Sequence, residues 1–113
     1  MHELGIAQNI INVIEKELVR CGGGRVLRVR LKIGEWSGVE PESLAFCYDA
    51  SVPQTMLEGS CLEIEHVPLL CHCPKCDNEF SPGRFSRACP HCGEARTEMI
   101  NGTELEIVDF EVE

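Results

Sequence analysis

The chain has 113 residues, 43% of them hydrophobic and 5% aromatic, and a formal net charge of −9. A chain of this length holds one domain with at most a small accessory module, and its core must be built mainly from aliphatic side chains. The negative charge disfavours binding to nucleic-acid phosphates and anionic membranes, and no apolar run approaches membrane-spanning length.

The first segment has the pattern of an amphipathic helix that begins almost at the first residue. Apolar residues recur there at steps of three and four: Leu4, Ala7, Ile11, Ile14 and Leu18. The helix should stop at Cys21, because the glycines at 22–24 adopt left-handed conformations readily and have little helix propensity. The segment lacks the basic region and unbroken apolar stretch of a signal peptide, so we expect a cytoplasmic protein.

Residues 27–33 alternate between apolar and basic, which predicts a strand with one buried face. The buried face would carry Leu27, Val29, Leu31 and Ile33. The exposed face would carry Arg28, Arg30 and Lys32. After a loop at 34–38, a second helix is expected from Pro41, since proline suits the first turn of a helix, and Pro53 ends it at the latest. Its apolar residues are Leu44, Phe46, Cys47 and Tyr48.

Two further strands are expected on either side of a cysteine-rich segment. Residues 62–66 alternate, and residues 105–112 alternate with a change of apolar phase between Ile107 and Val108, which a bulge would explain. Residues 70–97 have too few aliphatic side chains to form a core of their own. We therefore predict an α+β fold, with a small three-stranded sheet and two helices formed by residues 1–69 and 98–113. Residues 70–97 would form an inserted zinc-ribbon-like module with four cysteine ligands.

Four of the eight cysteines form two C-x2-C pairs, Cys73 with Cys76 and Cys89 with Cys92. Tetrahedral coordination by four sulfurs suits Zn(II) and leaves no position for a catalytic water, so a zinc ion here would be structural and would supply most of the folding free energy of the module. Iron in a rubredoxin-like site is the main alternative, and the short gap between the pairs and the scarcity of aromatics argue against it. Four reduced thiols packed as small hydrophobes are the remaining interpretation.

The other cysteines and the nearby histidines are interpreted without a metal role. Buried thiols are the expectation for the isolated cysteines, which are Cys21, Cys47 and Cys61. Cys71, His72 and His91 lie beside or inside the pairs, but the two pairs already complete the metal shell. Without a secretion signal, paired cysteines favour metal over disulfides.

His2 is a candidate ligand for a second, different metal. A free α-amine, the amide nitrogen of residue 2 and the imidazole of His2 can close two fused chelate rings in one plane. Planar coordination rich in nitrogen suits Ni(II) or Cu(II) more than Zn(II) or Mg(II). Glu3 could add a carboxylate or its backbone amide.

An ordered set of motifs extends over nearly the whole chain. Residues 1–4 (Met-His-Glu-Leu) open directly into a helix, and residues 30–35 (Arg-Leu-Lys-Ile-Gly-Glu) are followed at 37–42 by Ser-Gly-Val-Glu-Pro-Glu. Residues 62–64 (Leu-Glu-Ile) lead into the paired cysteines, and residues 102–105 (Gly-Thr-Glu-Leu) form the closing motif. Together these motifs resemble the HypA/HybF family, the nickel metallochaperones of [NiFe]-hydrogenase maturation.

The resemblance implies a nickel-binding α/β domain at 1–69 and 98–113 and a zinc-binding domain at 70–97. Nickel would be a transferable cargo taken by His2 with help from Glu3, and the four paired cysteines would hold zinc. An acidic residue after the first strand is linked to nickel handling in the family, and Glu40 is the nearest match. The family works with the GTPase HypB and delivers Ni(II) to the hydrogenase large-subunit precursor; in some organisms it also serves urease and its accessory proteins.

Two functions from other classes compete with this interpretation. A nucleic-acid-binding zinc ribbon needs a basic face, but residues 71–96 contain only four bases against three acids, and the strand face of 28, 30 and 32 is the best remaining surface. The four bases are Lys75, Arg84, Arg87 and Arg96. A one-electron carrier would hold iron on the cysteines and be coloured. We expect no enzyme, because the sequence offers no nucleophile and base pair, no phosphate loop and no open zinc site.

Overall fold

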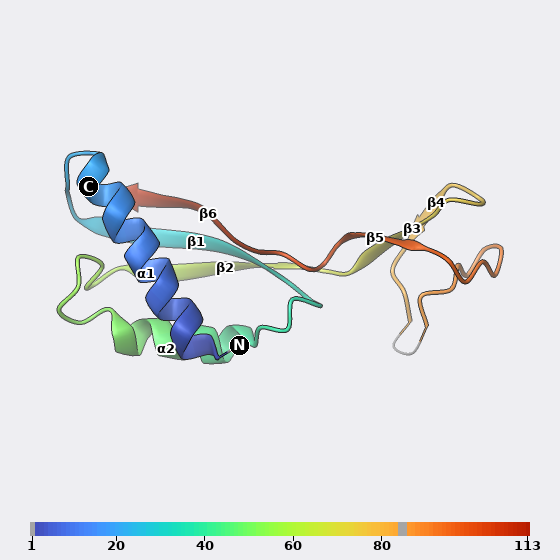
Figure 1. Ribbon diagram of the computed structural model, residues 1–113, viewed down its shortest axis with the longest axis horizontal. Coiled ribbons are helices and arrows are strands. Elements are labelled where there is room, and N and C mark those ends of the chain that lie inside the picture. The colour runs from blue at the N-terminus through green and yellow to red at the C-terminus, as the bar shows by residue number, and fades with distance from the viewer. Residues whose placement is uncertain (1, 84–85) are drawn as a thin grey trace.

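The computed structural model describes residues 2–83 and 86–113, so Met1, whose α-amine enters the predicted chelate, and Arg84 lie outside the described residues. The molecule is elongated, with principal-axis extents of 54 × 25 × 17 Å. Two helices and a three-stranded sheet form one end, and a second three-stranded sheet forms the other (Figure 1). The predicted α+β fold is therefore confirmed. Neither helix in this described part combines the length and the apolar character that a membrane crossing requires.

The larger end is built around a βαβ unit. Its elements are α1 (Glu3–Arg20), β1 (Val26–Gly34), α2 (Pro41–Ser51), β2 (Cys61–Val67) and the returning strand β6 (Leu105–Val112). The central strand β1 pairs in parallel with β2 and antiparallel with β6. Parallel neighbours need a crossover connection, and α2 supplies it.

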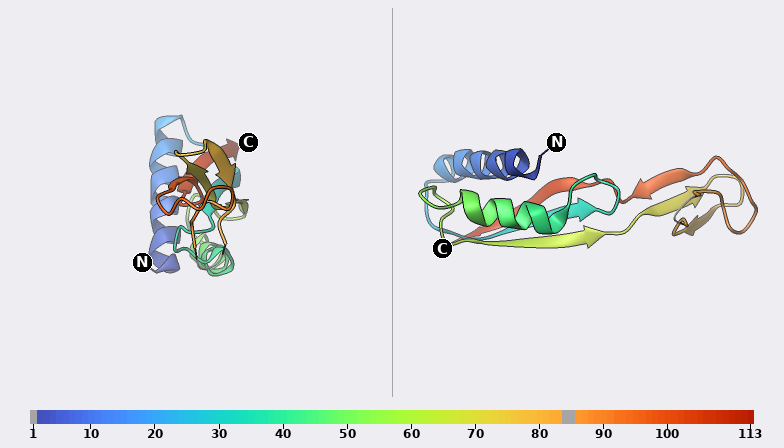
Figure 2. Two further views of the ribbon diagram at one scale, coloured as in Figure 1. Left: turned by 90° about the vertical axis from the view of Figure 1, so that its right-hand side faces the viewer. Right: turned by 90° about the horizontal axis from the view of Figure 1, so that it is seen from below.

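Helices α1 and α2 pack against each other and cover one face of this sheet (Figure 2). Val29, Leu31 and Ile33 of β1 face the helices and are at most 2% exposed, as their alternation predicts. At the start of the strand Val26, not Leu27, is fully buried, because the pairing with β6 shifts register there. Burying these aliphatic side chains stabilises the domain by roughly 1.5–3 kcal/mol each.

Strand β6 contains the predicted bulge. Leu31 pairs with Ile107 and Arg30 pairs with Asp109, so Val108 is the extra residue between the two pairs. Ile107 packs against the core, whereas Val108 is 47% exposed. The extra residue restores the apolar phase, so that the strand keeps its apolar side chains on the helix side before and after the bulge.

The structure corrects two expectations about burial. Leu4, predicted on the apolar face of α1, is 48% exposed, and Ile6 is buried instead. Among the isolated cysteines, Cys47 is half-buried, but Cys21 and Cys61 are exposed, so the expected burial is wrong for these two. Cys21 is the residue that caps the C-terminus of α1, and Cys61 begins β2; both positions lie at the margin of the core.

The sheet face opposite the helices carries an array of ion pairs. Arg30 donates two hydrogen bonds to Asp109 of β6, with N–O distances of 2.7 and 2.5 Å. Arg28 lies 3.4 Å from Glu63 of β2 and 3.8 Å from Glu111 of β6. Arg30 also lowers the pKa of Asp109 through its hydrogen bonds. The basic face of β1 is therefore matched by acids on both neighbouring strands, which argues against a phosphate-binding surface here.

The second sheet consists of three short strands that no sequence pattern predicts. They are β3 (Leu70–Cys73), β4 (Asn78–Phe80) and β5 (Glu98–Asn101), and β3 pairs antiparallel with both others. Its small core contains Leu69, Phe80 and three cysteines. Because β5 pairs with β3, this sheet extends to Asn101, beyond the insert expected at 70–97; the division into two domains remains a prediction.

The loop after β1 binds both chain segments that join the two sheets. The N–H of Glu35 donates to the carbonyl of Val67 at 2.8 Å, and Glu35 Oε1 accepts from the N–H of Leu69 at 2.9 Å. On the returning segment, the N–H of Trp36 donates to the carbonyl of Gly102 at 2.6 Å. These bonds fix the start of the second sheet relative to the first.

Candidate metal centres

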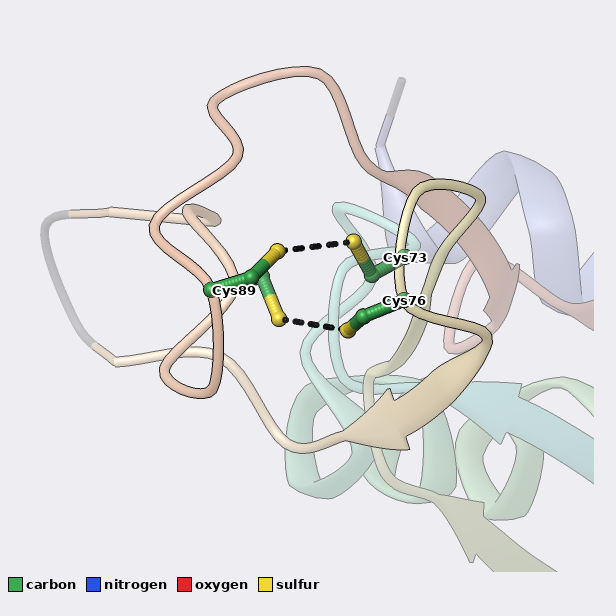
Figure 3. Close-up of side chains that lie close together, drawn as sticks. Cys73, Cys76 and Cys89 are labelled. Carbon is green, nitrogen blue, oxygen red and sulfur yellow. Dashed lines mark hydrogen bonds between the residues drawn. The ribbon is translucent and has the colours of Figure 1, made fainter.

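The structure brings the four paired cysteines together. Their sulfur atoms all lie within 4.8 Å of one another. Cys73 Sγ is 3.5 Å from Cys92 Sγ, and Cys76 Sγ is 3.5 Å from Cys89 Sγ. Figure 3 shows the side chains of Cys73, Cys76 and Cys89 pointing toward one another, with dashed lines on the two close sulfur pairs. The first pair comes from the end of β3 and the following turn, and the second from the loop before β5.

Each cysteine pair lies in the same kind of turn. The carbonyl of Cys73 accepts from the N–H of Asp77, and the carbonyl of Cys89 accepts from the N–H of Gly93, both at 2.8 Å. Asp77 and Gly93 each follow the second cysteine of a pair and have φ of +59° and +79°. A left-handed residue at this position reverses the chain, which leaves both sulfurs of the pair on one side of the turn.

Some of the cysteine sulfurs accept hydrogen bonds from nearby N–H groups, which favour a negative charge on these sulfurs. The backbone N–H of His91 donates to Cys89 Sγ at 3.4 Å, and the amide of Asn78 donates to Cys76 Sγ at 3.3 Å. A backbone hydrogen bond from Glu94 lowers the pKa of Cys92, but burial and the other three sulfurs outweigh it and raise this pKa to about 12. A cation bound among the sulfurs would favour the thiolate form of Cys92.

The four sulfurs fit a tetrahedral metal ion. At a metal–sulfur distance of about 2.3 Å the edges of such a tetrahedron measure about 3.8 Å, close to the observed pair distances. The quartet supplies four protein ligands, so a bound ion has no open position for substrate, and the cluster fits a structural metal site. Zinc and iron share this arrangement, and sulfur positions alone do not separate them.

His72 faces carboxylates and not the sulfurs. Its Nε2 lies 2.8 Å from Asp77 Oδ1, and its Nδ1 lies 3.6 Å from Glu98 Oε2. The hydrogen bond with Asp77 is the main cause that raises the pKa of His72. Because both ring nitrogens have carboxylate neighbours, the side chain is engaged outside the quartet, in line with its interpretation as a bystander. His91 is exposed.

His2 is exposed at the start of α1. It is the N-cap residue, with an extended backbone at φ −87° and ψ 139°, and its carbonyl accepts from the N–H of Ile6 at 3.2 Å. Its imidazole makes no capping hydrogen bond. Within the described part of the chain, the side chain of His2 is thus exposed and makes no hydrogen bond to the start of its own helix.

Glu3 connects the starts of the two helices. Its Oε2 accepts from the backbone N–H of Glu40 at 3.1 Å, and this bond is the main cause that lowers the pKa of Glu3. Glu40 is the N-cap residue of α2, and its own carboxylate accepts from the N–H of Glu42 at 3.0 Å. The predicted nickel residues His2 and Glu3 and the candidate Glu40 therefore lie around one point where α1 and α2 begin.

These three side chains do not form a complete set of ligands. Within residues 2–83 and 86–113, one group of three or more His, Cys, Asp or Glu side chains has its ligand atoms close enough together to hold a metal ion. That group is the cysteine quartet. A metal at His2 would therefore need backbone nitrogens as well as side chains, which is the coordination expected for nickel at a chain start.

Comparison with known proteins decides the family. Residues 1–112 match the family described as "Hydrogenase/urease nickel incorporation, metallochaperone, hypA". The chain belongs to the HypA family. It is 41% identical to the hydrogenase maturation factor HypA of Geobacter metallireducens over the full length of both chains. It is also 41% identical to HypA of Streptomyces avermitilis over 110 residues, 96% of this chain and 84% of that one.

The fold is shared with solved HypA structures. The solution structure of the Ni metallochaperone HypA from Helicobacter pylori matches with a TM-score of 0.69 over 99% of this chain and 97% of that chain, at 19% identity. The family to which this chain belongs is one of metallochaperones for nickel incorporation into hydrogenase or urease.

Two groups of residues around the HypA sites were not predicted from the sequence. Asp77 and Gly93 shape the cysteine turns, and their place directly after each C-x2-C pair is a signal that could have identified them. Glu35 and Trp36 hold the segments between the sheets, but their contacts join residues more than thirty positions apart, so no local pattern indicates them.

Proposed function

We propose that this HypA protein binds one Ni(II) at its N-terminus and delivers it to the large-subunit precursor of [NiFe]-hydrogenase. The ligands are the α-amine, the amide nitrogen of residue 2 and the imidazole of His2, with Glu3 beside them. The observation that carries the proposal is the exposed imidazole of His2, which makes no capping hydrogen bond in a family of nickel metallochaperones. Incomplete coordination by one chain suits a carrier, since the acceptor can take over the ion.

Zinc on Cys73, Cys76, Cys89 and Cys92 completes the proposal. The ion would hold the turns of the second sheet in place, where the apolar core is too small to do so. The closed sulfur shell gives it no catalytic role, so the protein is proposed to act as a carrier without enzymatic activity. The HypB GTPase is the proposed helper protein, urease accessory proteins are proposed as further partners, and the proposed location is the cytoplasm.

Metal analysis with nickel titration tests this function. The full-length protein should contain one zinc, remain colourless and bind one Ni(II) per chain. His2→Ala should abolish nickel binding and leave the zinc content unchanged. His66→Ala is the matched control, because His66 is an exposed histidine of the first sheet and its variant should bind nickel like the wild type. Unchanged nickel affinity in the His2 variant would refute the proposed site, and a coloured iron protein would refute the zinc assignment.

A further inference from the structure

We propose that the outward face of α2, centred on Phe46, is the surface on which the nickel acceptor docks. Phe46 is 74% exposed, more than any other large hydrophobic side chain of the described residues. Its neighbours Leu44 and Tyr48, two positions away on either side, are fully buried in the core. Packing within the domain therefore does not explain why an exposed position carries a phenylalanine. An exposed phenylalanine favours association with another protein.

Phe46 lies one helical turn from a groove between the two helices. Ala50 lies one helical turn after it and is its neighbour on the helix surface. Ala50 also lines a groove of about 350 Å³ between α1 and α2, and the groove continues to Leu4. Leu4 is 48% exposed and directly follows Glu3. The other residues that line the groove are mostly polar: Gln8, Asn12, Glu15, Ser51 and Thr55. Phe46 therefore lies as an apolar anchor beside a mixed groove that leads across the two helices toward the proposed nickel residues.

The charges beside Phe46 indicate the chemistry of the partner. Glu42 lies four residues before it and Asp49 three residues after it, and both are exposed. The ion pairs found in the described part of the chain involve neither carboxylate. The matching surface is an apolar pocket bordered by Lys or Arg. A second copy of this chain fits poorly, because it would bring acids against acids in a chain of net charge −9.

The position of Phe46 suits nickel transfer, and in this respect the inference rests on the proposed function. Glu40 begins α2 and its N–H binds Glu3. Phe46 follows six residues later, about 9 Å along the helix axis. A protein seated on Phe46 is therefore held beside His2, where the cargo must leave. Buried aromatic anchors carry much of the energy in protein interfaces, so Phe46 is the residue to change.

Binding to the two proposed partners tests the surface without nickel. Zinc-loaded full-length protein is titrated with the hydrogenase large-subunit precursor and, separately, with HypB. Phe46→Ala should weaken binding to the precursor at least tenfold, and Asp49→Lys should weaken it and reduce its dependence on salt. Val19→Ala is the control, because Val19 is 66% exposed near the other end of α1 and should leave the affinity unchanged.

The outcomes separate this surface from the nickel site. Since Phe46 is exposed, its variant should unfold like the wild type and bind nickel with unchanged affinity. Three outcomes would overturn the inference: no binding of the precursor to the wild type, a change of less than twofold in Phe46→Ala, or loss of binding to HypB alone. Failure of the wild type to bind nickel would reject the proposed function. The binding measurements with the precursor would still test the docking surface, because they are made without nickel.

Discussion

Glu3 contacts the backbone of the second helix although it begins the first. Its carboxylate accepts the N–H of Glu40, the residue at which α2 starts. A carboxylate that accepts this hydrogen bond is favoured in its charged form, which is why the pKa of Glu3 is lowered. Loss of nickel binding in a Glu3 variant therefore has two explanations, loss of a ligand or a change in the position of the two helices.

The two explanations predict different results for Glu3→Gln and Glu3→Ala. Glutamine keeps an oxygen that can accept the N–H of Glu40, whereas alanine has none. If Glu3 mainly positions the helices, Gln should retain nickel affinity near that of the wild type and Ala should lose it. The amide resonance of Glu40 in NMR spectra should stay in place in Gln and shift in Ala. Equal loss of nickel affinity in both variants, with unchanged Glu40 resonances, would instead identify the carboxylate as a ligand.

The same contact makes a prediction about pH. Because the folded-state pKa of Glu3 lies below its ordinary value of 4.5, its stabilising contribution is present above that value and is lost as pH falls through the lowered pKa. The Glu40 amide resonance of the wild type should titrate with this lowered pKa, and that of Glu3→Gln should not. A titration in Glu3→Gln that matches the wild type would show that another group is responsible.

At the scale of elements, the two cysteine turns depend on a left-handed residue after each pair. Gly93 occupies this position in the second turn with φ of +79°, and no atom would lie within 4 Å of an added Cβ. Gly93→Ala should therefore cost only conformational strain, roughly 1–2 kcal/mol. Since folding of the turn is coupled to metal binding, zinc affinity should fall by about tenfold, measured by competition with a chelator.

Gly83→Ala is the matched control for this turn. Gly83 lies in the same segment between β4 and β5 but has no positive φ, and among the residues that the structure describes an added Cβ would meet only Ser86 O, at 4.0 Å. Its variant should bind zinc like the wild type. Equal zinc affinities of the Gly93 and Gly83 variants would show that the left-handed turn does not limit metal binding.

Elements with a strong periodic pattern were predictable, and those held by distant contacts were not. The alternation in β1 identifies Val29, Leu31 and Ile33 as core residues, and the change of phase in β6 locates the bulge at Val108. In both strands the apolar side chains face the same core, so the order of apolar and polar residues along the chain is enough to predict which of them are buried. The convergence of the cysteine quartet follows in the same way, because two turns of equal spacing can share one ion.

Strands β3 to β5 show why the second sheet was not predicted. They contain four residues or fewer, and their pairing depends on the cysteine turns and on β3 as a common partner. The exposure of Phe46 is a similar case, since an apolar residue between two core residues of a helix looks like core in the sequence. Its outward position depends on which side of α2 meets the sheet, and that is decided by tertiary packing.

At the scale of the whole molecule, two glycines control how closely the segments between the sheets approach. A Cβ on Gly34 would overlap the carbonyl group of Gly102, and a Cβ on Gly102 would lie 2.6 Å from the Cα of Leu69. The three backbones are stacked at the point where the chain leaves the first sheet and returns to it. The loop of Glu35 and Trp36 can make its hydrogen bonds with both segments only because they lie this close.

Substitution of Gly102 should therefore disturb the connection between the sheets. Gly102 has φ of +117°, so an alanine there combines an unfavourable backbone conformation with a clash against the backbone of Leu69. The free energy of unfolding of the zinc-loaded protein should fall by roughly 2–5 kcal/mol, measured by urea denaturation.

Gly22→Ala separates the two causes, because Gly22 has φ of +101° but open space around an added Cβ. Its cost should stay near 1–2 kcal/mol, roughly the strain of the backbone alone. If both variants unfold at the same urea concentration, the close approach of Gly102 to Leu69 contributes nothing, and the two sheets are not held by this contact.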